Sequence, residues 1–243
     1  MGRLTDETVI VTGASRGLGA SMATQFAAEG ANVVLTARNV DDLETIASEA
    51  DGETLVVPAD VTDEAAVEAL VAETVDEYGE LTGLVNNAGV GMLSLHDELY
   101  EIVDVPADDF RLILDVNVTG VFLCSKHAVP AMFDAGRGNV INISSGLGRR
   151  AAPKWGPYVA SKWALEGLSK TLSMEVEPEI NVNVLDPGGR VETRFWDHLP
   201  EDERADVLEP DVMDEAATLL LTQKPGRVSG ESMAADEWEA RLG

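Results

Sequence analysis

Short apolar runs alternate with longer amphipathic stretches along most of the chain. Six of these runs are rich in Val, Ile and Leu and short enough to be strands; they cover residues 9–11, 32–36, 54–57, 84–85, 139–143 and 182–185. Strands of a parallel sheet are buried on both faces, so they read as continuous apolar runs rather than alternating ones. The pattern therefore predicts a core of buried parallel strands.

Stretches with helical spacing separate the apolar runs. Between residues 62 and 79 the apolar positions recur every three or four residues, at Val67, Leu70, Val71, Val75 and Tyr78. Thr62 is expected to cap this helix and Gly79 to end it. The same reasoning predicts helices over residues 18–29, 41–50, 108–133 and 158–176. Alternating strands and helices predict an α/β fold, with a doubly wound parallel sheet covered by helices on both faces, and residues 1–243 forming a single domain.

The chain is strongly acidic: it has 44 Asp and Glu against 17 Lys and Arg, and its formal net charge is −27. Such a surface repels phosphate backbones, which argues against a nucleic-acid partner. The acids are spread along the chain rather than collected in a tail. This spread favours adaptation to a high-salt cell. In molar salt the Debye length shrinks to about 3 Å, and screening then removes the repulsion among the carboxylates. The alternative is a surface that is simply very soluble.

Other residue types restrict the function classes further. Cys124 is the one cysteine, so no internal disulfide is expected, and its place in a predicted helix favours a core side chain. His96, His127 and His198 lack ligand spacing, and no metal site is expected. We find neither a signal peptide nor an apolar run of membrane-spanning length, and therefore expect a cytoplasmic protein without a membrane partner.

A glycine-rich turn follows the first predicted strand and opens the first helix. It reads Thr12-Gly13-Ala14-Ser15-Arg16-Gly17-Leu18-Gly19. Glycines allow a tight turn and a close approach of backbone to a pyrophosphate, and the free N–H groups of a helix N-terminus attract that anion. We therefore expect a dinucleotide to contact Gly13, Ser15, Arg16, Gly17, Leu18 and Gly19.

The end of the second strand indicates which dinucleotide binds. It reads Thr36-Ala37-Arg38, where an NAD enzyme usually has an acid for the ribose hydroxyls. Arg38, together with Arg16 in the glycine turn, suits the 2′-phosphate of NADP(H). The sequence thus favours NADP(H) over NAD(H). The alternative is that both arginines are solvated surface side chains.

Tyr158 and Lys162 are four residues apart in a predicted helix, so their side chains share one face. A free phenol has a pKa of about 10, and a neighbouring ammonium group favours the phenolate. We therefore expect Lys162 to lower the pKa of Tyr158. Taken alone, the pair is more typical of an amphipathic surface. Ser145, however, follows the fifth strand at the sheet edge where ligands bind, which favours a catalytic group.

The spacing TGxxxGxG, taken with the Tyr–Lys pair and the preceding serine, resembles the short-chain dehydrogenase/reductase family. This resemblance implies a Rossmann-like sheet of about seven strands, the last near residues 229–233. It implies an NAD(P)-dependent oxidoreductase that moves a hydride between nicotinamide and the alcohol or carbonyl carbon of a small molecule. It also implies a homo-oligomer, either a tetramer or a dimer.

The resemblance assigns roles to individual residues. Tyr158 is the general acid/base, Lys162 binds the nicotinamide ribose, and Ser145 binds the reacting oxygen, with Ser144 as the nearby, more structural alternative. Asn117 supports a water relay to the lysine, although a satisfied buried amide explains it nearly as well. Further cofactor contacts are implied at Asp60, Val61, Asn87, Ala88, Gly89, Pro187, Gly188, Val191 and Thr193.

The chain departs from the family pattern in three places. Thr193 follows Pro187 by six residues where the family usually has five. Its position is therefore offset by one residue from that of the family's ligand threonine. Residues 90–116 form a longer segment than expected, with an extra turn predicted over residues 93–97. Residues 236–238 read Asp-Glu-Trp where a glycine-rich ending is usual.

Substrate and function leave alternatives open. The segments expected to wall the pocket favour an apolar or cyclic group, on account of Leu147, Trp155, Phe195 and Trp196. An anion is the alternative, since the same region contains Arg149, Arg150 and Lys154. The rival function is a non-catalytic NADP-binding sensor of the same fold, which would tend to lose the tyrosine or the lysine.

Overall fold

The computed structural model describes residues 2–96, 98–191 and 207–243. Its main sheet has seven parallel strands in the order β3-β2-β1-β4-β5-β6-β9. Their bounds are β1 Thr8–Thr12, β2 Asn32–Thr36, β3 Thr54–Val56, β4 Gly83–Asn86, β5 Gly138–Ile143, β6 Ile180–Asp186 and β9 Ser232–Ala234. The short strands β7 (Arg190–Val191) and β8 (Val207–Leu208) pair separately. The predicted doubly wound parallel sheet is thus confirmed.

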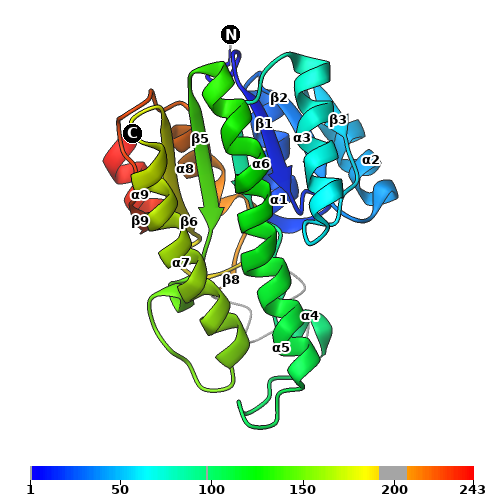
Figure 1. Cartoon of the computed structure of the whole chain (residues 1–243), viewed down its shortest axis with the longest axis vertical. Helices are drawn as coiled ribbons and strands as arrows, with labels where there is room; N and C mark the ends of the chain where they lie inside the picture. Colours follow the sequence, from blue (N-terminus) through cyan, green and yellow to red (C-terminus); the bar gives the residue numbers. More distant parts are fainter. Residues whose placement is uncertain (1, 97, 192–206) are drawn as a thin grey trace.

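The apolar runs form strands because both of their faces are covered. Every residue of β1, β5 and β6 is buried. One face packs on α1 (Gly17–Ala28), α2 (Val40–Glu49), α8 (Asp214–Leu221) and α9 (Ala235–Leu242). The other packs on α3 (Glu64–Tyr78), α6 (Gly120–Ala135) and α7 (Gly156–Val176). Figure 1 shows the sheet between these two helical layers.

The strand order reverses between β1 and β4, which are neighbours in the sheet although β2 and β3 lie between them in the sequence. In open α/β sheets a ligand binds outside the carboxyl ends of the strands at such a reversal. In Figure 1 the arrows of β1 and β5 point toward α4 (Met92–Leu95), α5 (Ala107–Leu114) and the start of α7. A ligand is therefore expected to bind near these elements.

One helical run is longer than the sequence predicts. Alpha-helix α5, a π-helical turn at Asp115–Thr119 and α6 form a continuous run over Ala107–Ala135. By length and composition it meets the requirements of a membrane span, with a mean hydropathy of 1.3 in its most apolar window, which corrects our expectation that no such run exists. Half of that window is buried inside the protein, as in the core helix of a globular fold.

Local structure corrects two further predictions. Asp63, not Thr62, caps α3, because its carboxylate accepts hydrogen bonds from the N–H groups of Ala65 and Ala66. Thr62 instead donates to the Oδ1 atom of Asp60. The last strand lies at Ser232–Ala234, slightly later than predicted.

Two sequence expectations agree with the structure. The extra turn in the long segment after β4 is α4. Burial raises the pKa of the Cys124 thiol to about 12, so this core cysteine remains a thiol at neutral pH. The unusual ending is anchored in the core, since Trp238 is fully buried and its Nε1 atom donates to the Val184 carbonyl at 2.9 Å.

Candidate active site

The glycine turn after β1 lies directly against the loop after β4. Asn87 donates from Nδ2 to the carbonyl oxygens of Thr12 (2.9 Å) and Gly13 (3.2 Å). The Thr12 hydroxyl accepts from the backbone N–H groups of Asn87 and Ala88, both at 3.0 Å. These bonds fix the two loops at the point where the strand order reverses.

The turn leaves no room for side chains at two of its glycines. Gly13 has φ of +66°, in the left-handed region, and a β-carbon there would lie 2.9 Å from the Ala88 Cα atom. At Gly19 a β-carbon would lie less than 3.0 Å from both the Gly13 carbonyl oxygen and the Asn87 amide. Arg16 is the N-cap of α1 and its side chain has no acceptor atom, so a pyrophosphate fits the N–H groups of the first helical turn.

Substitution Gly19→Ala is expected to lower the free energy of unfolding by about 1–3 kcal/mol, because the backbone of the turn must move to admit a β-carbon. Cofactor affinity should fall with it. The matched control is Gly167→Ala in α7, where a β-carbon meets nothing within 4 Å. That control should stabilise the helix by about 0.5–1 kcal/mol. Equal urea midpoints for the two variants would contradict the prediction.

Ala37 and the two predicted phosphate-binding arginines lie beside this turn. The Ala14 N–H donates to the Thr36 carbonyl at 3.2 Å, which ties the turn to the end of β2. Arg16 and Arg38 are both exposed. Asp60 lies close to Arg38: burial opposes its ionisation, but hydrogen bonds from Thr62 and the charge of Arg38 hold its pKa below the ordinary value.

Asn117 connects the loop after β4 with the turn of α7 that contains Tyr158. It lies in the π-helical turn and is fully buried. Its Oδ1 atom accepts from the Val90 N–H at 2.8 Å, and its Nδ2 atom donates to the Val90 carbonyl and to Ser161 Oγ, both at 2.9 Å. Ser161 in turn donates to the Tyr158 carbonyl at 2.8 Å. Asn117 is therefore a fully satisfied amide that fixes the geometry around Tyr158.

Lys162 lies under the ring of Tyr158. It is only 4% exposed, its Nζ atom is 5.6 Å from the ring centroid, and it donates to the Ile143 carbonyl at 2.7 Å. Burial lowers the pKa of Lys162 to about 8. Gly89 lies close by, where a β-carbon would be 3.9 Å from Nζ. The lysine is thus held at the carboxyl edge of the sheet between β4 and β5.

Tyr158 differs from the sequence expectation in the direction of its pKa shift. Burial raises the pKa to about 12, the charge of Asp186 adds to the increase, and a hydrogen bond with Ser145 opposes it. The predicted lowering by Lys162 is not found, and the loss of hydration on burial is the largest cause of the shift. The phenol is therefore protonated at neutral pH.

The two serines after β5 have separate partners. Ser145 faces Tyr158 and accepts a hydrogen bond from the Leu147 N–H at 3.2 Å. Ser144 is buried and donates to Glu166 Oε1 at 2.9 Å. Trp155 packs edge-on against the Tyr158 ring, with centroids 5.8 Å apart. The structure therefore brings Ser145, Tyr158, Lys162 and Asn117 together.

The remaining predicted contacts lie around the ends of β3 and β6. Val61 and Val191 are buried, and Gly188 has φ of +75° with its N–H donating to Asp186 Oδ1 at 2.9 Å. Thr193, Phe195 and Trp196 lie outside the described residues.

Sequence reasoning missed the ionic partners of the site. Arg149 is bonded to Asp186, Glu166 and Ser232, so its guanidinium is already engaged and does not stand open to an anionic substrate. The one available sequence signal was Glu166, which follows Lys162 by one helical turn.

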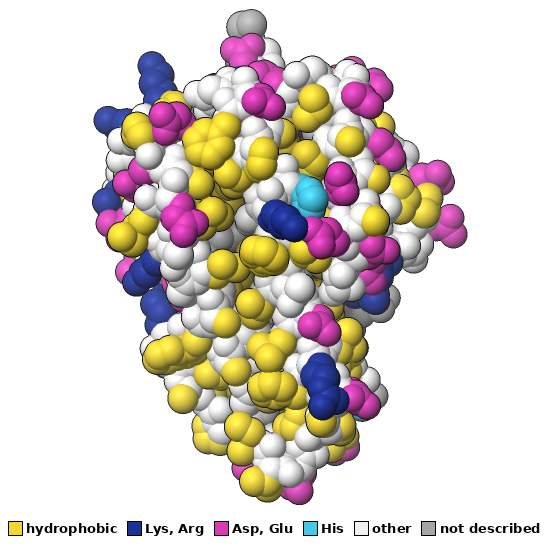
Figure 2. All heavy atoms as spheres, viewed as in Figure 1, with side chains coloured by type: hydrophobic (Ala, Val, Ile, Leu, Met, Phe, Trp, Pro, Cys, Tyr) yellow, Lys and Arg dark blue, Asp and Glu magenta, His cyan; other side chains and the backbone are white. Residues whose placement is uncertain are grey.

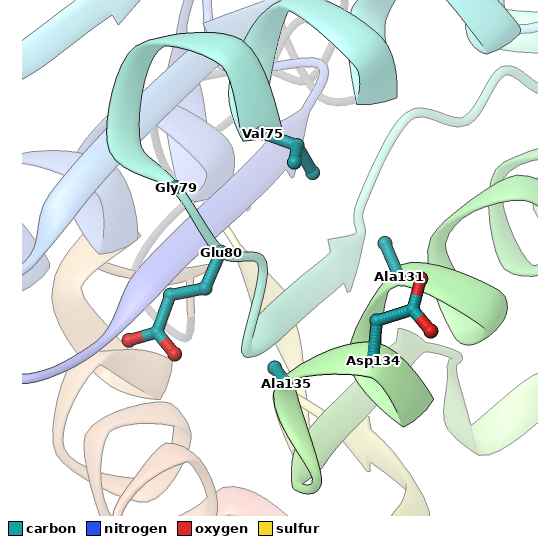
Figure 3. A pocket seen from close by; sticks show the side chains of 6 residues that line it. All are labelled: Val75, Gly79, Glu80, Ala131, Asp134 and Ala135. Atoms are coloured by element: carbon teal, nitrogen blue, oxygen red, sulfur yellow. The ribbon is translucent and has the colours of Figure 1, made fainter.

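A hollow of about 310 Å³ lies elsewhere, between the ends of α3 and α6 (Figure 3). Its lining residues are Val75, Gly79, Glu80, Ala131, Asp134 and Ala135. It adjoins the starts of β4 and β5, at the opposite edge of the sheet from Tyr158. Among the described residues no cluster of His, Cys, Asp or Glu fits a metal ion.

Comparison with known proteins decides the family. Residues 7–204 match the family model described as short chain dehydrogenase. The chain belongs to the short-chain dehydrogenase/reductase family. As a member, it is an oxidoreductase that works with a nicotinamide cofactor, and its Rossmann-like fold is the fold of that family.

Similar short-chain dehydrogenases/reductases act on varied molecules. The chain is 38% identical over 183 residues to "NADPH-dependent pterin aldehyde reductase" of Arabidopsis thaliana, covering 74% of each chain. It is 31% identical to "2,5-dichloro-2,5-cyclohexadiene-1,4-diol dehydrogenase" of Sphingobium indicum, covering 97% of this chain and 98% of the relative. A crystal structure of a short-chain type dehydrogenase/reductase from Mycobacterium marinum superposes with a TM-score of 0.85 at 28% identity, covering 95% and 94% of the two chains.

Proposed function

We propose that this enzyme is an NADP(H)-preferring dehydrogenase/reductase in which Tyr158 is the general acid/base. The observation that carries the proposal is the convergence of Tyr158, Ser145 and Lys162 at the carboxyl edge of the sheet, braced by Asn117. A non-catalytic sensor would have no need for this arrangement.

When bound, the nicotinamide would supply the hydride that reduces a carbonyl carbon, or accept the hydride of an alcohol carbon in oxidation. In reduction, the Tyr158 hydroxyl gives its proton to the carbonyl oxygen as that oxygen gains the electron pair of the C=O π bond. In the reverse direction the Tyr158 phenolate removes the alcohol proton. Ser145 holds the reacting oxygen beside Tyr158, and Lys162 binds the nicotinamide ribose at the carboxyl edge of the sheet.

Three observations support NADP(H) as the preferred cofactor. Ala37 offers no carboxylate to the ribose hydroxyls at the end of β2. Arg16 in the glycine turn and Arg38, which follows Ala37, are exposed on a surface with few basic residues. One relative is named as NADPH-dependent. We infer the same preference here.

Cyclic alcohols and carbonyls are the substrates we propose. Trp155 packs beside Tyr158, and the relatives include proteins named for pterin aldehyde, cyclohexadienediol and hydroxysteroid substrates. The test follows nicotinamide absorbance with a panel of cyclic ketones, aldehydes and secondary alcohols, using acyclic analogues as the comparison. Turnover with ring compounds and NADPH is expected. Binding of NADPH without turnover of any panel member would favour the sensor.

The apolar face of α5, α6 and α7 is our candidate for a contact between copies of the chain. Its exposed side chains are Leu112, Phe122, Phe133, Trp163 and Met174. Figure 2 shows hydrophobic side chains gathered over the lower half of this view, while acidic ones lie mostly in the upper half. We propose that this face forms a dimer or tetramer interface.

Light scattering is expected to show an oligomer that Trp163→Glu combined with Met174→Glu converts to monomer, because four or more buried carboxylates would then meet at the interface. The control is Val40→Glu, which adds an acid at an exposed apolar residue of α2. A monomeric wild-type protein would refute the interface.

We propose that the enzyme works in the cytoplasm of a cell with high internal salt, in keeping with a net charge of −27. Molar KCl is expected to raise the Tm relative to dilute buffer, because screening removes repulsion among the carboxylates. For a protein of this size each kcal/mol corresponds to about 2–4 °C. Calorimetry at several KCl concentrations measures the effect. Full stability and activity in dilute buffer would contradict the proposed adaptation to high salt.

A further inference from the structure

Glu166 is a buried carboxylate that none of the proposed catalytic steps uses. Only 9% of the residue is exposed, and its Oε1 atom accepts three hydrogen bonds. The donors are Ser144 Oγ at 2.9 Å, Ser232 Oγ at 3.0 Å and Arg149 Nη1 at 3.4 Å. A buried carboxylate is costly unless it is paired and hydrogen-bonded, so these partners explain how it is tolerated.

Arg149 joins Glu166 to a second buried carboxylate. Its Nη2 atom donates to Asp186, which is 2% exposed, and its Nη1 atom donates to Ser232 Oγ at 2.6 Å. Asp186 also accepts from the Gly188 N–H. One guanidinium thus bridges the ends of β6 and β9 and the middle of α7.

The Arg149–Glu166–Asp186 network adjoins the site residues through Glu166. Ser144, held by Glu166, is bonded covalently to Ser145. Glu166 lies one helical turn beyond Lys162, on the same face of α7. The network is therefore linked to Ser145 through Ser144 and to Lys162 along α7.

The electrostatic effects follow the same connections. Burial lowers the pKa of Lys162, and the charge of Glu166 opposes that decrease. Asp186 raises the pKa of Tyr158. When Arg149 and Lys162 are both charged, their positive charges equal in number the negative charges of Glu166 and Asp186.

Other charged groups on the elements that pack around Tyr158 and Lys162 form ion pairs of their own or act on Arg149. Alpha-helix α5 also packs on α7, but Asp108 pairs with Arg111 and Asp109 with His96. Asp115 begins the π-helical turn that packs on α7, and it is not among the causes of either shift. Glu237 of α9 acts on Arg149.

We propose that Arg149 and Glu166 are positioning residues, which hold Ser145 through Ser144 and set the charge state of Lys162. The expected effect on catalysis rests on the proposed function. The expected change in the Lys162 titration does not. Glu166→Gln keeps an oxygen acceptor for the serines and removes the charge. Arg149→Met removes the charge that offsets Glu166, and Arg149→Lys restores it.

The test follows the titration of Lys162 by NMR in protein with carbon-13-labelled lysine, its signal assigned with Lys162→Met. Glu166→Gln is expected to lower the pKa of Lys162 by about one unit and Arg149→Met to raise it by a similar amount. Arg149→Lys should stay close to wild type. The control is Arg241→Met, which breaks the Arg241–Glu231 surface pair at a similar exposure.

The same variants should move the pH profile of turnover in the same two directions. Lys162 titrations in folded Glu166→Gln and Arg149→Met proteins that coincide with wild type would overturn the proposal. If Arg149→Met does not fold, the other two variants still test the proposal. A lowered Lys162 pKa is then expected in Glu166→Gln, and a pKa close to wild type in Arg149→Lys. Shifted titrations in a protein without turnover would leave the network standing and refute the proposed function instead.

Discussion

Substitution Tyr158→Phe is expected to lower kcat for carbonyl reduction by roughly two to four orders of magnitude, the usual range for loss of a general acid. The phenol is well suited to that role, because burial raises its pKa to about 12 and keeps the proton in place at neutral pH. Steady-state kinetics measures the loss. Reduction should be faster than oxidation near neutral pH, since oxidation requires the phenolate.

The matched control for this variant is Tyr100→Phe. Tyr100 is also hydrogen-bonded, to Glu98 at 2.8 Å, and its ring packs edge-on against His96, with centroids 5.6 Å apart. Its removal should leave kcat near wild type. A Tyr158→Phe enzyme that keeps more than a tenth of wild-type kcat, with unchanged circular dichroism, would assign the proton transfer to another group.

The second large effect is expected at Arg38. A charge-assisted hydrogen bond contributes about 1.5–3 kcal/mol, so Arg38→Ala should weaken NADPH binding by roughly 10- to 150-fold. NADH has no 2′-phosphate, and its affinity should stay within about twofold of wild type. Adding Ala37→Asp should then invert the preference, because a carboxylate at the end of β2 binds the ribose hydroxyls and repels the phosphate.

Fluorescence titrations with both nucleotides measure these affinities. Arg241→Ala serves as the control, since it removes an equal charge from an α9 side chain that is paired with Glu231 at the surface. Equal losses for NADPH and NADH in Arg38→Ala would show that the residue acts on the fold of the turn rather than on the phosphate.

Hydrophobic patterning was sufficient to predict the sheet, because parallel strands buried on both faces leave a signal that survives in the sequence. Each predicted strand overlaps an observed one, for example residues 139–143 and β5 at Gly138–Ile143. The Tyr158 and Lys162 pair was predictable for a similar reason: helical spacing of four places two side chains on one face. Local chemistry was harder to predict. Thr62 and Asp63 are both good caps, and the hydrogen bonds that each side chain makes in the folded protein decide between them.

The electrostatics of the site was beyond sequence reasoning. The pKa of Tyr158 depends on how completely its ring is buried, and burial is a property of the packed fold. The ionic network has the same character. Arg149, Glu166 and Asp186 lie on a loop, a helix and a strand, and they meet only because β5, β6 and α7 pack together.

The most direct test of the account is a titration of the folded wild-type protein with NADPH and with NADH, in dilute buffer and in molar KCl, monitored by nucleotide fluorescence. The account predicts saturable binding of both, with NADPH favoured by at least about tenfold, the lower bound for one charged contact to the 2′-phosphate. A preference for NADH would contradict the cofactor assignment. Absence of binding to either nucleotide by a folded protein would contradict the proposed active site itself.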